Sequence, residues 1–179
     1  MIIATDFDGT VANYGATVGS APEFNTALLL QWVQLGVTGV AVATNQGSLG
    51  MGLLEWKTPE GAPYPSPSHF ARRINEFHTA LKVYGVPLVC VKVATYHTRV
   101  PLDDCIRAAN LLKDLVSLDV LLGVSWMRAW RKPSPLMLLG MPSTPAIFYG
   151  DSDEDEQAAQ AAGIPFVRVE RFCGAKGVA

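Results

Sequence analysis

Residues 1–10 of the chain read MIIATDFDGT, and this stretch decides the fold. The short apolar run Met1–Thr5 stops at Asp6, which is typical of a buried strand that carries a carboxylate at its carboxyl end. Asp8 follows two residues later, and we expect Phe7 between the two acidic residues to turn into the core. Gly9 then opens a turn-rich segment. The chain therefore begins with a strand that delivers two acidic side chains to one edge of a sheet.

Strand-like and helix-like segments alternate along the rest of the chain. Further strands are expected at 37–43, 88–94, 120–124, 146–149 and 166–169, and helices at 23–35, 68–84, 103–116, 134–139 and 154–162. Residues 45–67 are expected to form a loop with a short helix near Leu53. Because the strands are continuous apolar runs, the pattern predicts an α/β fold: a Rossmann-like, doubly wound parallel sheet with helices on both faces.

Composition restricts the class of protein. The 179 residues are 49% hydrophobic and 17% charged, which is typical of one compact domain over residues 1–179 rather than of a disordered chain. The net charge of −2 excludes a globally basic surface, so a nucleic-acid partner would need a local patch. Apolar stretches such as 27–35 are shorter than the roughly 20 residues that span a membrane, so no membrane partner is expected.

The cysteines and the first residues of the chain bear on its compartment. Cys90, Cys105 and Cys173 show no CxxC spacing, and their odd number is typical of free thiols in a reducing environment. The N-terminus leads directly into a strand and a charged turn, so no signal peptide is expected. We therefore expect a cytoplasmic protein.

Polar residues follow three of the predicted strands. Asp6 and Asp8 follow the first strand, Thr44 and Asn45 the second, and Asp151 a later one. The carboxyl ends of parallel strands meet at one edge of the sheet, and ligands of such folds bind beyond that edge. We therefore expect these side chains to converge on one crevice.

The pair formed by Asp6 and Asp8 is the strongest chemical signal. Two carboxylates this close raise one pKa unless a cation lies between them. A hard divalent ion such as Mg²⁺ prefers oxygen ligands and can also hold a phosphate oxygen. An ordinary acidic pair in a turn or helix cap is the alternative interpretation.

Three later segments could also bind phosphate, offset negative charge or hold the metal ion. The turn at 44–47, TNQG, offers a hydroxyl, an amide and backbone N–H groups that suit phosphate oxygens, although such side chains also bond their own backbone. Lys132, which precedes a proline, either lies on the surface or stabilises a carboxylate and a negative transition state. Asp151 ends a strand and Asp155 opens a helix, where acidic residues are also favourable without a metal. That helix-start interpretation does not explain Asp151.

In chain order, the segments DFDGT, TNQG, KP and GDSDEDEQAAQAAG resemble the four motifs of the haloacid dehalogenase-like (HAD) superfamily. The resemblance extends from Met1 to about Val169, and its most specific parts are DFDGT and the pattern GD-x-x-x-D-x-x-AA-x-x-AG. It implies the HAD core fold. The second acidic residue of DFDGT is typical of the phosphatases of this superfamily rather than the dehalogenases, so the resemblance implies an enzyme that hydrolyses phosphate monoesters.

The resemblance also implies roles for individual residues. Asp6 is similar to the nucleophile that forms an aspartyl-phosphate, and Asp8 to the general acid and base. Thr44 and Asn45 would hold the phosphoryl oxygens, and Lys132 would orient Asp6 and offset negative charge.

A magnesium cofactor is implied by the same resemblance. Its ligands would be Asp6, Asp151 and the backbone carbonyl of Asp8, with Asp155 assisting directly or through water. Residues 9–19 would form the mobile turn that the family places beside the site.

The cap that covers the site in many HAD members is expected to be minimal. Only a short segment separates Asp8 from the helix at 23–35, and the remaining insertions, at about 48–67 and 99–125, are small. We therefore expect an open site that accepts a bulky phosphorylated substrate.

Three segments bear on the substrate. TNQGSLGMG, GVPLVCVKVATYH and WRKPSPLML together resemble the 3′-phosphatase domain of polynucleotide kinase/phosphatases, which implies a nucleic-acid 3′ end as substrate. Histidinol-phosphate and heptose-bisphosphate phosphatases share TNQ and RKP, so a sugar or histidinol-type phosphate is the alternative. Those families usually carry a Cys/His zinc loop before RKP. His97 and Cys105 are too sparse for such a loop, so no zinc is expected.

Two further interpretations stay open at this point. A receiver-like module that accepts phosphate without turnover would also gather Asp, Thr and Lys at strand ends, although Asp8 counts against it. Trp126 and Trp130 either stack a nucleobase or belong to the core. Arg72 and Arg73 are expected on an exposed helix face. His97 ends a strand, where it either approaches the crevice or, as we expect, is a hydrogen-bonded structural histidine.

Overall fold

The computed structural model describes residues 1–13, 22–116 and 120–174. Its strands form one parallel six-stranded sheet in the order β4-β3-β2-β1-β5-β6, which confirms the predicted fold class. The bounds are Ile2–Thr5 (β1), Gly39–Asn45 (β2), Leu88–Ala94 (β3), Leu121–Ser125 (β4), Phe148–Gly150 (β5) and Phe166–Arg168 (β6). Of the segment 9–19 expected to be a mobile turn, residues 14–19 lie outside the described residues.

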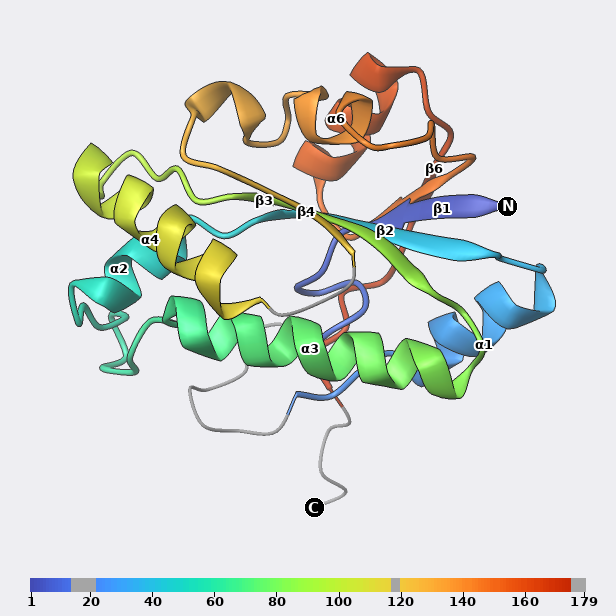
Figure 1. Ribbon diagram of the computed structural model, residues 1–179, viewed down its shortest axis with the longest axis horizontal. Helices are drawn as coiled ribbons and strands as arrows, with labels where there is room; N and C mark the ends of the chain where they lie inside the picture. The colour runs from blue at the N-terminus through green and yellow to red at the C-terminus, as the bar shows by residue number, and fades with distance from the viewer. Residues whose placement is uncertain (14–21, 117–119, 175–179) are drawn as a thin grey trace.

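Helices cover both faces of this sheet (Figure 1). Helices α1, α3 and α4 lie on one face, and α6 lies on the other. The bounds are Thr26–Gln34 (α1), Ser48–Leu53 (α2), Pro67–Val83 (α3), Leu102–Leu115 (α4), Leu136–Leu139 (α5) and Asp153–Ala162 (α6), with a 3₁₀ turn at Arg128–Trp130 (η1). The short helix expected near Leu53 is α2. None of the helices in the described part of the chain has the length and apolar character that a membrane span requires.

The two faces of the sheet carry side chains of different size. Because side chains alternate along a strand, β1 and β2 present large apolar residues to α1 and α3 and alanines to α6. The large set includes Ile3, Val40 and Val42, and the small set Ala4, Ala41 and Ala43. The same apolar cluster contains Ala158 and Ala159 of α6. The first turn of α6 lies beside the end of β1, because Lys132 joins Asp6 to Asp155 of that turn.

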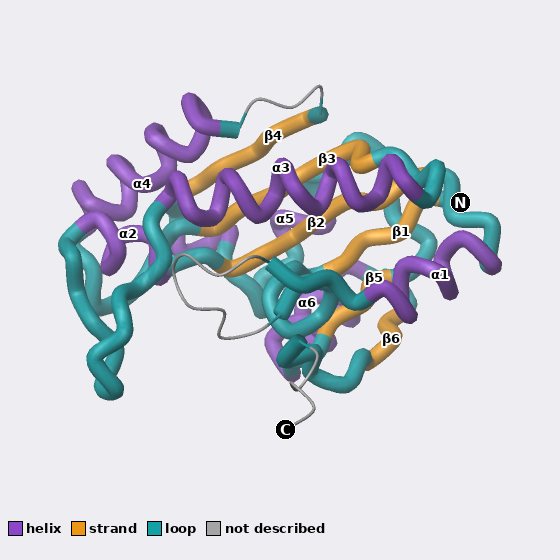
Figure 2. Tube along the Cα trace, turned by 90° about the horizontal axis from the view of Figure 1, so that it is seen from below, coloured by secondary structure: helices purple, strands orange, loops and turns teal. Residues whose placement is uncertain are grey.

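The sheet reverses its winding direction at β1. This strand pairs with β2 on one side and with β5 on the other (Figure 2), and the helices that follow β1 and β5, α1 and α6, lie on opposite faces of the sheet (Figure 1). In doubly wound sheets, such a switch point opens a crevice at the carboxyl ends of the strands. Asp6 directly follows β1 and Asp151 directly follows β5, so the topology places both at this crevice.

The two segments predicted to be insertions contribute to the body of the fold. Residues 48–67 contain α2, and residues 99–125 contain α4 and the edge strand β4. Helix α4 packs against α2, α3 and β4. The extent of the domain and the boundaries of these insertions stay predictions.

Candidate active site

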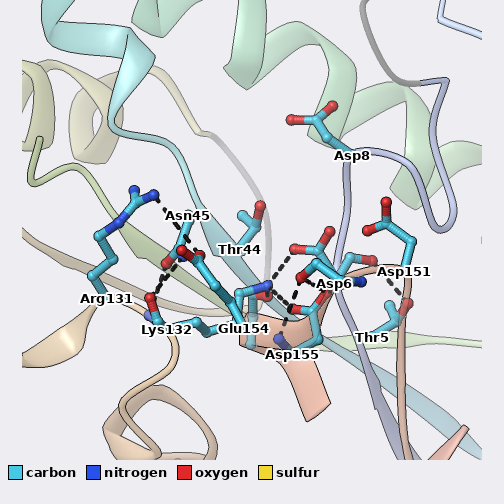
Figure 3. Close-up of polar contacts among 12 residues, drawn as sticks. Thr5, Asp6, Asp8, Thr44, Asn45, Arg131, Lys132, Asp151, Glu154 and Asp155 are labelled. Carbon is cyan, nitrogen blue, oxygen red and sulfur yellow. Dashed lines mark hydrogen bonds and ion pairs between the residues drawn. The ribbon is translucent and has the colours of Figure 1, made fainter. Parts of the chain in front are cut away.

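A cavity of about 340 Å³ opens at the switch point of the sheet. Most of the predicted site residues line it, namely Asp6, Asp8, Thr44, Asn45, Lys132 and Asp151. Asp155 lies behind them and is 1% exposed. The expected convergence of polar side chains from the ends of several strands is therefore present in the structure (Figure 3).

Asp6 keeps one carboxylate oxygen free beside the cavity. Its backbone N–H donates to the carbonyl of Tyr149 at 2.8 Å, which fixes the end of β1 against β5. Oδ1 accepts from Lys132 Nζ at 2.5 Å, and within the described residues Oδ2 accepts no hydrogen bond. Burial raises the pKa of Asp6 to about 7, a shift that Lys132 opposes and Asp155 increases. A buried, poorly solvated carboxylate with one free oxygen is suited to nucleophilic attack.

The ammonium of Lys132 contacts three oxygen atoms from three elements. Nζ donates to Oδ1 of Asp6 and Oδ1 of Asp155 at 2.5 Å each, and to the carbonyl of Ala43 at 3.0 Å. Burial lowers the pKa of Lys132, but the two carboxylates outweigh this effect, so the pKa is raised and the charge is kept. Lys132 therefore lies where it can orient Asp6 and offset negative charge.

Asp155 is fixed by the first turn of α6. Its Oδ2 accepts from the backbone N–H and the hydroxyl of Ser152, and its own N–H donates back to that hydroxyl, which forms a capping box. Gly150 leaves room for this arrangement, because a Cβ there would lie 2.5 Å from Cβ of Asp155. The start of α6 thus holds the carboxylate that in turn holds Lys132.

Asp6, Asp151 and Asp155 form a group that could bind a metal ion. One carboxylate oxygen from each lies within 4.8 Å of the other two, in the part of the chain that the structure describes. Gly9 approaches this group closely: its φ is +84°, and a Cβ there would lie 2.6 Å from Oδ2 of Asp151. Three hard oxygen donors around one point fit Mg²⁺.

The three acidic residues differ in how free they are to act as ligands. Both oxygens of Asp155 already accept hydrogen bonds, from Lys132 and Ser152. Within the described residues, the carboxylate of Asp151 is held by an exposed partner: its Oδ2 accepts from Nε of Arg171 at 2.6 Å, and the Arg171 side chain is 49% exposed. Asp6 and Asp151 could therefore ligate a metal ion directly, and Asp155 is better suited to the water-mediated role.

Asp8 lies apart from this group in the close-up view (Figure 3). Its Oδ1 accepts from Arg73 at 2.5 Å, and its Oδ2 accepts from Nε2 of Gln46 at 2.6 Å. Asp8 is thus held by a neighbouring helix and a neighbouring strand end. Its predicted metal contact through the backbone carbonyl stays a prediction.

The two residues predicted to bind phosphoryl oxygens differ in availability. Oγ1 of the buried Thr44 accepts from Gln46 at 3.1 Å, which leaves the hydroxyl hydrogen for a ligand. Asn45 uses both amide hydrogens, one on the carbonyl of Lys132 and one on Glu154, while its Oδ1 accepts from the N–H of Lys132. Asn45 therefore fixes the backbone of Lys132, and its role as a phosphate ligand stays a prediction.

The prediction for Arg73 was wrong. The sequence favours an exposed helix face for this residue, but it is 5% exposed and pairs with Asp8. The reason is its position on the stripe of α3 that also carries Phe70, Ile74 and Phe77, all of which are buried. Arg72, by contrast, is partly exposed and pairs with Glu76.

Sequence reasoning also missed the part played by Gln46, which contacts both Asp8 and Thr44. The residue lies within the TNQG segment, but nothing in that segment indicates which carboxylate its amide meets. His97, expected to be structural, lines the cavity together with Arg131 and Arg171.

The two tryptophans near Lys132 are partly buried against the core. Trp126 packs against buried apolar residues and lies under Nζ of Lys113 at 6.0 Å. Trp130 packs against the apolar residues between the sheet and α6, with Nζ of Lys92 5.6 Å from its ring. Neither ring lines the cavity, which favours the core interpretation over base stacking.

Comparison with known proteins gives a likeness in fold to solved structures. Neither a protein-family model nor a curated protein sequence matches the chain. Among solved structures, it is similar to D,D-heptose 1,7-bisphosphate phosphatase from B. bronchiseptica, determined in complex with magnesium and phosphate. The TM-score is 0.62 at 22% sequence identity, covering 98% of this chain and 83% of that one. At this identity the likeness shows that the two chains share a fold.

Proposed function

We propose that this protein is a magnesium-dependent phosphomonoester hydrolase of the HAD type that works through an aspartyl-phosphate on Asp6. The observation that carries this proposal is the environment of Asp6. One of its oxygens is held by the buried Lys132, and the other is free beside a cavity that Asp8 and Asp151 also line. The fold likeness to a phosphatase solved with magnesium and phosphate supports the same conclusion.

The proposed reaction has two displacements at phosphorus. In the first, Oδ2 of Asp6 attacks the phosphorus, the bond to the leaving oxygen breaks, and Asp8 gives that oxygen a proton. In the second, water gives a proton to Asp8 and attacks the phosphorus, and the bond to Asp6 breaks, which releases phosphate and restores the Asp6 carboxylate and the protonated Asp8. Lys132 keeps Asp6 oriented throughout, and Thr44 donates its hydroxyl hydrogen to a phosphoryl oxygen.

A bound magnesium ion would supply positive charge to the phosphoryl oxygens and to the acidic group around them. Asp6 and Asp151 would hold it with their carboxylates and Asp8 with its carbonyl oxygen, while Asp155 would act through water. Arg171 would be released from Asp151, which is a small change because half of the arginine side chain is exposed.

Two arginines line the rim of the cavity in addition to Lys132. Arg131 lies 3.8 Å from Glu154 in a loose, partly exposed pair, and Arg171 lines the same opening. Such a rim favours a substrate with a second anionic group. A nucleic-acid 3′ end and a sugar bisphosphate both meet this condition, and the likeness to a heptose bisphosphate phosphatase favours the second.

A magnesium-dependent screen of phosphate esters tests the proposal. The panel should contain p-nitrophenyl phosphate, sugar mono- and bisphosphates, histidinol phosphate and a 3′-phosphorylated oligonucleotide, with Asp6→Asn as control. We expect turnover that chelation abolishes, and the preferred ester identifies the substrate class. Stable labelling by a phosphodonor without turnover of any ester would instead favour the receiver-like module.

A further inference from the structure

Arg73 connects α3 to the loop that follows β1. Its two terminal nitrogens donate to different parts of that loop, one to Oδ1 of Asp8 at 2.5 Å and the other to the carbonyl of Asn13 at 3.1 Å. The guanidinium also lies over the ring of Phe7, 5.0 Å from its centroid. Arg73 thus contacts the loop at three points around Asp8.

Burial of the Arg73 guanidinium costs free energy, so a role other than stability is needed to explain it. Its side chain is 6% exposed, and within the described residues its buried Nε finds no hydrogen-bond partner. Removal of a guanidinium from water carries a desolvation penalty that a well-packed apolar side chain avoids. Stability alone therefore does not account for an arginine here, whereas Arg72, the preceding residue, keeps its charge in water.

The two oxygens of Asp8 have partners of unequal strength. Oδ1 accepts a charge-assisted bond from Arg73, while Oδ2 accepts from the neutral amide of Gln46. Charge-assisted bonds are about twice as strong as neutral ones. Oδ2 is therefore the oxygen that can exchange its partner for a substrate atom while Arg73 still holds the carboxylate in place.

We propose that Arg73 is a positioning residue that acts on catalysis through Asp8. It holds Oδ1 of Asp8 and leaves Oδ2 to exchange protons with the leaving oxygen and the attacking water. The inference rests on the proposed phosphatase function and adds to it a residue from α3, which itself contacts neither the phosphate nor the metal site. Loss of Arg73 should slow the steps that need Asp8 and spare those that do not.

A leaving-group experiment separates these steps. p-Nitrophenyl phosphate releases its phenolate without needing a proton, so formation of the aspartyl-phosphate does not require Asp8, whereas its hydrolysis does. With magnesium and this ester, Arg73→Met should release a burst of about one nitrophenolate per site and then turn over roughly 10²-fold more slowly than the wild type. Binding of inorganic phosphate should be unchanged. Arg73→Lys should restore part of the rate, because an ammonium keeps the charge but reaches fewer acceptors.

Arg72→Met is the matched control, since it removes the neighbouring arginine from the same helix. It should turn over like the wild type. A second comparison introduces Arg73→Met into the Asp8→Asn variant. There it should lower the turnover rate by less than about threefold, because the effects of residues that act as one unit are not additive. Arg73→Lys serves the same comparison if Arg73→Met does not fold.

Three results would overturn the inference. The Arg73→Met variant could turn over as fast as the wild type, or it could lose the burst together with turnover. The third result is that Arg73→Met lowers the turnover rate by the same factor in the Asp8→Asn variant as in the wild type. Failure of the phosphatase proposal looks different, because the wild type would then hydrolyse no ester.

Discussion

Nζ of Lys132 lies 2.5 Å from Oδ1 of Asp6, although 126 residues separate the two in the sequence. Both side chains are nearly inaccessible to water, with 3% and 9% of their surface exposed. The contact depends on three features that meet at the switch point: the end of β1, the backbone clamp from Asn45 and the capping box of α6. This ion pair joins distant parts of the fold and also orients Asp6, so its loss should affect both stability and activity.

Replacement of Lys132 by Met should therefore impair both stability and activity. The variant leaves two buried carboxylates without their cation, and loss of one partner of a buried pair costs about 3–5 kcal/mol in the free energy of unfolding. Urea unfolding measures this loss. The exposed Lys82 on α3 offers a control, because Lys82→Met should change the free energy of unfolding by less than about 0.5 kcal/mol. Equal effects of the two substitutions would contradict the assigned role of Lys132.

Gly9→Ala should weaken magnesium binding. At φ +84° an alanine is strained by about 1–2 kcal/mol, and its Cβ would also meet the Asp151 carboxylate. Gly61 shares the φ of +84°, but a Cβ there would meet no atom within 4 Å, so Gly61→Ala carries the strain without the clash. We expect both variants to lose similar stability, and only Gly9→Ala to lose about tenfold in magnesium affinity. Titration of the melting temperature with magnesium measures this, and equal affinities in the two variants would count against a metal at Asp151.

Magnesium should stabilise the protein more at pH 8 than at pH 5. Burial raises the pKa of Asp6 from 3.8 to about 7, so between these values the folded state binds more protons than the unfolded state. The free energy of unfolding of the metal-free protein therefore falls as the pH rises through this window. A cation beside the ionised Asp6 offsets that loss. Melting temperatures with and without magnesium at the two pH values test this, and Asp6→Asn should reduce the difference between them.

The sheet was predictable because buried parallel strands are continuous apolar runs. The predicted strand at 88–94 matches β3, and the predicted strand at 37–43 is displaced by two residues from β2. The displacement has a physical reason. Backbone pairing with Val93 and Ala94 extends β2 through the polar Thr44 and Asn45, where an apolar pattern stops.

The convergence of Asp6, Thr44 and Asp151 was also predictable, since parallel strands place their carboxyl ends at one edge. The position of Arg73 could have been predicted too. It follows Phe70 by three residues and precedes Phe77 by four, which is the spacing of one helix face. The charge of Arg73 favours exposure, whereas this periodicity indicates burial. The structure agrees with the periodicity, since Arg73 is buried.

The clamp that Asn45 forms on Lys132 was not predictable. It joins side-chain atoms to backbone atoms 87 residues away, and the sequence around neither residue records that contact. The same is true of Gln46, whose partner Asp8 is known only once β1 and β2 are side by side.

The most direct test of the account is the turnover of a phosphate ester by Asp6→Asn in the presence of magnesium. An amide is a poor nucleophile, so a folded variant should turn over p-nitrophenyl phosphate at least about 10⁴-fold more slowly than the wild type. The wild type, quenched in acid during turnover, should carry phosphate on Asp6. A folded Asp6→Asn variant with near-normal rates would contradict the assignment of Asp6 as the nucleophile.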